Sequence, residues 1–113
     1  MRSIRNPAAT LEFEIAQEKA AALGRLGRGL EAALAALRSF DAAHRPPASR
    51  EDRRCRDQLV AQAGQALWYL MVQRDACGLY NSAAVISDYG VPPEVVHRAG
   101  PTPAVPAAAH ESV

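Results

Sequence analysis

The most informative segment of this chain is Ala66-Leu67-Trp68-Tyr69-Leu70-Met71-Val72. These seven apolar or aromatic residues follow one another inside a segment that otherwise reads as one long helix. A helix turns about 100° per residue, so the run leaves no polar face, and such a helix is normally buried on every side. The rest of the chain offers one more long helix and short pieces. We therefore expect a second copy or another partner to supply part of the cover.

Proline divides the chain into a predicted antiparallel helical hairpin, residues 10–43 and 50–77. Residues 11–42 contain no proline, whereas Pro46 and Pro47 follow at the predicted connection. The residue before a proline is pushed out of the helical region, and proline donates no backbone hydrogen bond. We expect Thr10 to cap the first helix. Glu12 and Glu14 would then lie in its first turn, where negative charge suits the helix dipole.

The second helix has its own start and stop signals. Ser49 precedes Asp52 by three residues, a variant of the capping box with aspartate in place of glutamate or glutamine. Gly78 is the residue expected in the left-handed conformation after Cys77, with Leu79 folding back on the last turn.

An apolar stripe marks the inner face of the first helix. Its members are three or four residues apart, which is typical of a core-facing helix: Leu23, Leu26, Leu30, Ala33, Leu37 and Phe40. We expect Leu30 and Leu37 to face Leu67 and Leu70 across the hairpin. Glycines at 24, 27 and 29 predict a close approach of another backbone or a bend, or else a cost absorbed by packing elsewhere.

Two short helices are predicted within residues 82–99, packed on one end of the bundle. Asn81 or Ser82 can cap the first and Gly90 can end it, and the second begins near Pro92-Pro93. Residues 10–99 then form a single helical domain, with residues 1–9 as a flexible arm and the Pro/Ala-rich residues 100–113 as a disordered tail.

Charge and cysteine content favour an ordinary cytoplasmic protein. Thirteen basic and twelve acidic residues give a net charge of +1, which offers no general attraction to nucleic acid or anionic membrane. Cys55 and Cys77 are 22 residues apart on one predicted helix. At about 1.5 Å per residue they are too distant for a disulfide. No signal peptide or membrane span is evident, so we expect a reducing, cytoplasmic setting.

No pattern in the sequence predicts catalysis, a cofactor or a metal. His44, His97 and His110 lack the spacing of metal ligands. Cys77 is interpreted as a small buried residue at a helix C-terminus. Cys55 lies among arginines, which is a better setting for a thiolate. The same arginine cluster, at positions 50, 53, 54 and 56, could meet phosphates or an acidic partner. Interleaved acidic residues make local ion pairing the simpler interpretation.

Three segments together resemble a family of small bacterial helical proteins of unknown function. They are LEFEIAQEKAAALGRLGRGLEAALAAL, ALWYLMVQRDACGLYN and ISDYGVPPEV. The resemblance covers roughly residues 10–98. Its motifs carry no catalytic meaning, so it implies a bacterial cytosolic protein without assigning an activity or a site.

We therefore expect an all-α protein that dimerises into a helical bundle and acts as a non-enzymatic structural or protein-interaction module. The predicted interface comprises Trp68, Tyr69, Met71 and Val72. The alternative is a DNA-binding regulator that uses a helix-turn-helix-like segment at residues 83–98. Its recognition helix would offer only His97 and Arg98, so a cap on the bundle is the better interpretation. No cofactor, membrane or small-molecule substrate is expected.

Overall fold

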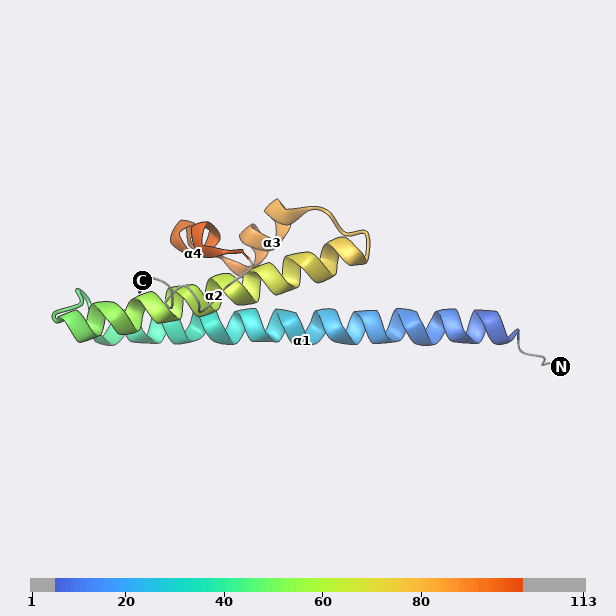
Figure 1. Cartoon of the computed structure of the whole chain (residues 1–113), viewed down its shortest axis with the longest axis horizontal. Coiled ribbons are helices and arrows are strands. Elements are labelled where there is room, and N and C mark those ends of the chain that lie inside the picture. Colours follow the sequence, from blue (N-terminus) through green and yellow to red (C-terminus); the bar gives the residue numbers. More distant parts are fainter. Residues whose placement is uncertain (1–5, 101–113) are drawn as a thin grey trace, which may run out of the picture.

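Four helices and no strand make up residues 6–100, the part of the chain that the computed structural model describes. They are α1 (Pro7–Ala43), α2 (Arg50–Ala76), α3 (Ser82–Tyr89) and α4 (Pro93–Arg98). Figure 1 shows α1 and α2 running antiparallel, with α3 and α4 alongside α2. The predicted all-α hairpin is confirmed.

The start of α1 differs from the prediction. Asn6 caps the helix, its side chain accepting a 2.9 Å hydrogen bond from the backbone N–H of Ala8. Pro7 occupies the first turn, where its fixed φ suits a helix and its missing N–H costs nothing. The expected cap at Thr10 is wrong, and residues 7–9 belong to the helix and not to a flexible arm. Glu12 and Glu14 consequently lie beyond the first turn. Residues 1–5 and 101–113 of the predicted arm and tail lie outside the described residues.

The predicted ends of α2 are confirmed. Ser49 Oγ accepts a 3.0 Å bond from the N–H of Asp52, and Asp52 Oδ2 accepts one of 3.1 Å from the N–H of Ala48. The reciprocal bond thus reaches one residue further back than in the usual capping box. At the other end Gly78 has φ +81°, and the N–H of Leu79 donates to the carbonyl of Arg74 at 2.8 Å. This geometry ends the helix and turns the chain back.

The short helices also form as predicted, but they cover a side of the hairpin and not its end. Asn81 caps α3 by accepting from the N–H of Ala84, and Gly90 ends it at φ +63°. Figure 1 shows α4 lying along the middle of α2. Val91 and Val95 are buried beneath this cover.

The core fills the space between α1, α2 and the two short helices. Leu30, Leu37, Leu67 and Leu70 are all buried, as predicted. The remaining buried apolar residues are Leu34, Val60, Ala63, Val85, Val91 and Val95. The predicted stripe is wrong in part. It omitted Leu34, which is buried, and it included Ala33, Leu26 and Phe40, which are only half-buried. With 3.6 residues per turn, the face that meets α2 shifts away from a strict seven-residue repeat.

Two glycines let the short helices approach closely. A Cβ atom at buried Gly27 of α1 would overlap the hydroxyl of Tyr89 in α3. A Cβ atom at Gly64 of α2 would lie 2.8 Å from the carbonyl carbon and oxygen of Arg98. Gly29, by contrast, faces open space. Gly27 is therefore approached by a side chain and not by the predicted backbone, whereas Gly64, outside the predicted set of glycines, lies against a backbone.

Candidate functional site

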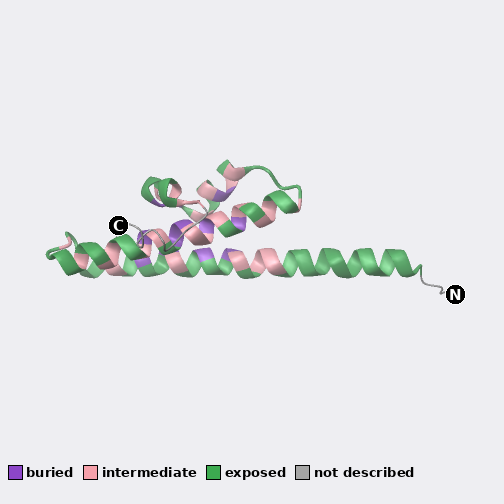
Figure 2. Cartoon of the chain, in the orientation of Figure 1, coloured by how far each residue is buried: buried purple, intermediate pink, exposed green. Residues whose placement is uncertain are grey.

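The first four turns of α1 project beyond the rest of the fold. Every residue from Pro7 to Ala21 is exposed, and we call this segment the overhang. Figure 2 shows it as a continuous exposed stretch that no other helix covers. Leu11, Phe13 and Ile15 are 56%, 63% and 45% exposed. A helix of this length gains most of its stability from packing, so these side chains indicate a contact surface.

The three apolar side chains of the overhang do not share one face. At about 100° per residue, Leu11 and Ile15 lie within about 40° of each other, whereas Phe13 lies on the other side of the helix. Leu11 and Ile15 line up with Ala22 and Leu26 further along α1. The overhang also carries Glu12, Glu14, Glu18 and Lys19, so it is acidic overall.

The side of the hairpin away from α3 carries a half-buried apolar strip. Its members are Ala22, Leu26 and Ala33 of α1 with Leu59 and Ala66 of α2, and we call it the open flank. Gly27 contacts Tyr89 of α3. Helical geometry places Leu26 and Gly27 on opposite sides of Leu30, so the open flank and α3 lie on opposite sides of the hairpin. The apolar line of the overhang continues directly into this flank.

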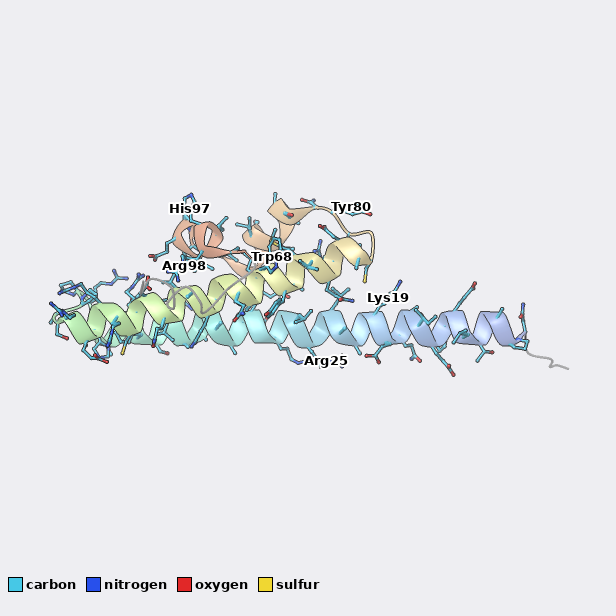
Figure 3. The ribbon with its side chains drawn as sticks, in the orientation of Figure 1. Lys19, Arg25, Trp68, Tyr80, His97 and Arg98 are labelled. Atoms are coloured by element: carbon cyan, nitrogen blue, oxygen red, sulfur yellow. The ribbon has the colours of Figure 1, made fainter. Side chains whose placement is uncertain are left out.

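The four residues of the predicted interface do not form one surface. Tyr69 and Val72 lie on the outer side of α2, at 50% and 47% exposure. Trp68 is half-buried and lies on α2 beneath α3 (Figure 3), and Met71 packs against the core of its own chain. Helix α2 packs against α1 and α4, and of the four predicted interface residues only Tyr69 and Val72 are exposed. One chain therefore buries this stretch only in part, as expected, and cover of Tyr69 and Val72 by a second copy stays a prediction.

Arg56 ties three helices together. Its Nε and Nη2 donate to Asp41 of α1 at 2.7 and 3.0 Å, and its Nη1 and Nη2 donate to Glu94 of α4 at 2.9 and 2.7 Å. These bonds lower the pKa of both carboxyl groups, with Arg56 hydrogen bonding as the main cause, and raise the pKa of Arg56. Local ion pairing within residues 50–57 is therefore a wrong prediction for Arg56, because its partners come from other helices.

The arginine cluster borders an open cleft of about 510 Å³ between α2 and α4. Its lining combines apolar Pro47 and Val60 with six charged or titratable residues, Arg53, Arg56, Asp57, Glu94, His97 and Arg98. Arg56 is held by Asp41 and Glu94, and Arg98 Nη1 donates to Asp57 at 2.8 Å. Most of the charge is neutralised within the chain.

Helix α4 lacks the free surface of a DNA-reading helix. Figure 3 shows Arg98 between α4 and α2, where it bonds Asp57, and His97 pointing away from the fold. Glu94 is engaged by Arg56. Val95 anchors the helix in the core. A recognition helix presents several basic and polar groups to the bases, whereas α4 presents only His97.

Cys55 does not have the surroundings of a reactive thiolate. Both thiols are free. The pKa of Cys55 is raised by desolvation and by its hydrogen bond to Glu51, at 3.6 Å from Sγ to Oε2. The neighbouring arginines do not reverse this shift. The arginines near Cys55 therefore do not create the setting for a thiolate that the sequence suggests there.

Across residues 6–100, no three His, Cys, Asp or Glu side chains gather in a way that could hold a metal ion. None of the helices there is long and apolar enough to cross a membrane.

These features define an all-α helical hairpin with a two-helix cover and an exposed helical overhang. The chain belongs to the family of unknown function DUF6665, whose model matches residues 1–108. The match confirms the resemblance inferred from the sequence and extends beyond residues 10–98. No curated protein and no solved structure matches the chain.

Proposed function

We propose that this protein is a non-enzymatic protein-interaction module that acts as a homodimer through its exposed helical surfaces. The overhang carries the proposal, because three large apolar side chains project into water on a helical segment that nothing in the described part of the chain supports. Soluble proteins seldom leave such a segment without a partner. Tyr69 and Val72 on α2 form a second candidate surface.

The proposal includes a reducing, cytosolic setting for this module, in which free thiols stay unoxidised. Cys55 and Cys77 are free, and structural disulfides are a feature of oxidising compartments. An interaction module needs no reactive group, and the two-helix cover serves to complete the core beneath Val91 and Val95.

The experiment is site-specific photo-crosslinking of the full chain in the cells that produce it. A photoreactive residue at Ile15 should give a discrete adduct, whereas the same residue at Ala35, exposed on a different side of α1, should give none. A third position at Val72 examines the second surface. Equal background labelling at all three positions would contradict the proposed function.

A further inference from the structure

The open flank and the overhang are complementary to themselves. Resting on the proposed function, we infer that the partner is a second copy of the chain, docked antiparallel along α1 so that Ile15 of each copy meets Leu26 of the other. Both residues lie on the same side of α1, away from α3. A two-fold axis would then make each contact twice and close the assembly.

The spacing along α1 supports this register. Residues 8, 15, 22 and 29 recur every seven positions as Ala, Ile, Ala and Gly, and the interleaved residues 12, 19, 26 and 33 are Glu, Lys, Leu and Ala. Such alternating spacings of three and four form the seam of an antiparallel helix pair. With Ile15 opposite Leu26, Ala8 faces Ala33 and Ala22 faces the aliphatic stem of Lys19. The small residues allow the two helices to approach closely.

The charges agree with the same register. It places Glu18 of each copy beside Arg25 of the other at the edges of the seam, where coiled coils carry their ion pairs. Within one chain these two side chains already pair at 3.3 Å, with 73% and 59% exposure. Such an exposed pair contributes little and exchanges partners readily. Figure 3 shows Arg25 and Lys19 pointing to different sides of α1, so only Arg25 flanks this edge.

The most obvious competing register is disfavoured by charge. Placing overhang on overhang, with Ile15 facing Ile15, would bring Glu12 of one copy near Glu18 of the other. The overhang carries three glutamates and one lysine, whereas the next two turns carry Arg25 and Arg28. The overhangs of two copies therefore repel each other, whereas the overhang of one copy is attracted to residues 22–28 of the other.

The experiment mixes two charge-reversed full-length chains. Glu18→Arg alone and Arg25→Glu alone each place like charges across the seam, so each should dimerise about tenfold or more weakly than the wild type. Mixing them should restore dimers as heterodimers. The arginine introduced at position 18 of one chain would meet the glutamate introduced at position 25 of the other, and the unchanged Arg25 of the first would meet the unchanged Glu18 of the second.

Pairing within one chain cannot explain this recovery, since both single variants have like charges at positions 18 and 25. Sedimentation velocity of each chain and of the mixture measures the effect.

Matched controls use a second pair with the same spacing. Glu31 and Arg38 are exposed and lie seven residues apart on another side of α1. The variants Glu31→Arg and Arg38→Glu, alone or mixed, should have the same dimer dissociation constant as the wild type. Ile15→Ser should weaken the dimer, whereas Phe13→Ser, on the other side of the overhang, should not. Circular dichroism confirms that each variant is folded.

Several outcomes would overturn the inferred register or the second copy as partner, while leaving the protein-interaction role itself standing. A wild-type chain that stays monomeric at all concentrations, but cross-links through Ile15 to a different protein, would exclude a second copy. A dimer that survives Glu18→Arg and Ile15→Ser but is lost in Val72→Ser would move the interface to α2. Failure of heterodimers to form on mixing would exclude this register.

Discussion

Gly64 of α2 lies directly against the backbone of Arg98 at the end of α4, where a Cβ atom would sit 2.8 Å from the Arg98 carbonyl group. Backbone cannot move aside as a flexible side chain can. The absence of a side chain at position 64 is therefore what lets α4 settle onto α2 and bury Val95.

Gly64→Ala should destabilise the fold by about 1–3 kcal/mol, the usual cost of overpacking a close contact. The control is Gly24→Ala on another side of α1, where a Cβ atom would meet only the flexible end of the Arg28 side chain, at 3.3 Å. The helix propensity of alanine should add up to about 1 kcal/mol there. Urea unfolding of both variants measures the difference. Equal stabilities would show that α4 does not dock at this position.

Leu67→Ala should destabilise by about 2–5 kcal/mol, because the side chain is fully buried and its removal leaves a cavity. Leu34→Ala should lower the free energy of unfolding by a similar amount. Val72→Ala, on the exposed side of α2, should change the free energy of unfolding by less than about 0.5 kcal/mol. A thermal midpoint unchanged in Leu67→Ala would mean that the wrong face of α2 has been assigned to the core.

The Arg56 network predicts a specific dependence on pH. The folded pKa values of Asp41 and Glu94 lie below their ordinary values of 3.8 and 4.5. The stabilisation that these two carboxylates give is therefore complete at pH above their ordinary pKa values. It is lost as the pH falls through their lowered pKa values in the folded state. Arg56→Gln should cost about 1–2 kcal/mol at neutral pH, since Glu94 remains partly exposed.

The difference in free energy of unfolding between Arg56→Gln and the wild type should shrink as the pH falls through the lowered pKa values of Asp41 and Glu94. Arg50→Gln is the control, because Arg50 makes no ion pair within residues 6–100. Chemical unfolding at a series of pH values provides the measurement. A constant difference down to acidic pH would show that Arg56 contributes by packing and not by its ion pairs.

The double variant Cys55→Ser/Cys77→Ser should retain the helical circular dichroism of the wild type, because both thiols are free and only partly buried. Cys55 should also react more slowly with iodoacetamide at neutral pH than an unstructured cysteine peptide, since its raised pKa reduces the thiolate fraction. Loss of helicity, or faster alkylation than the peptide, would contradict this assignment.

The boundaries of the helices are largely predictable because their causes are local. Pro46 and Pro47 interrupt the chain, Ser49 and Asn81 act as caps, and Gly78 and Gly90 adopt positive φ. Each of these residues sets the backbone conformation or hydrogen bonding of residues only a few positions away in the sequence. The start of α1 departs from the prediction because Asn6 and Pro7 provide an earlier cap that competes with Thr10.

The contacts that join the elements are not predictable in the same way. Arg56 pairs with residues 15 and 38 positions away, and the role of Gly64 depends on where the backbone of Arg98 arrives. The choice of Leu34 over Ala33 for the core follows from the side of α1 that α2 occupies. The overhang continues a normal helical pattern, and its only signal in the sequence is that the first predicted helix, residues 10–43, is longer than the second, residues 50–77. The structure widens this difference to 37 residues in α1 against 27 in α2.

The mass of the full chain in solution is the most direct test of self-association through α1. Light scattering at micromolar concentrations should give twice the chain mass of 12.1 kDa, and dilution should convert the species to the monomer. A mass of one chain across the whole concentration range would contradict the claim that the protein acts through self-association of its exposed helices.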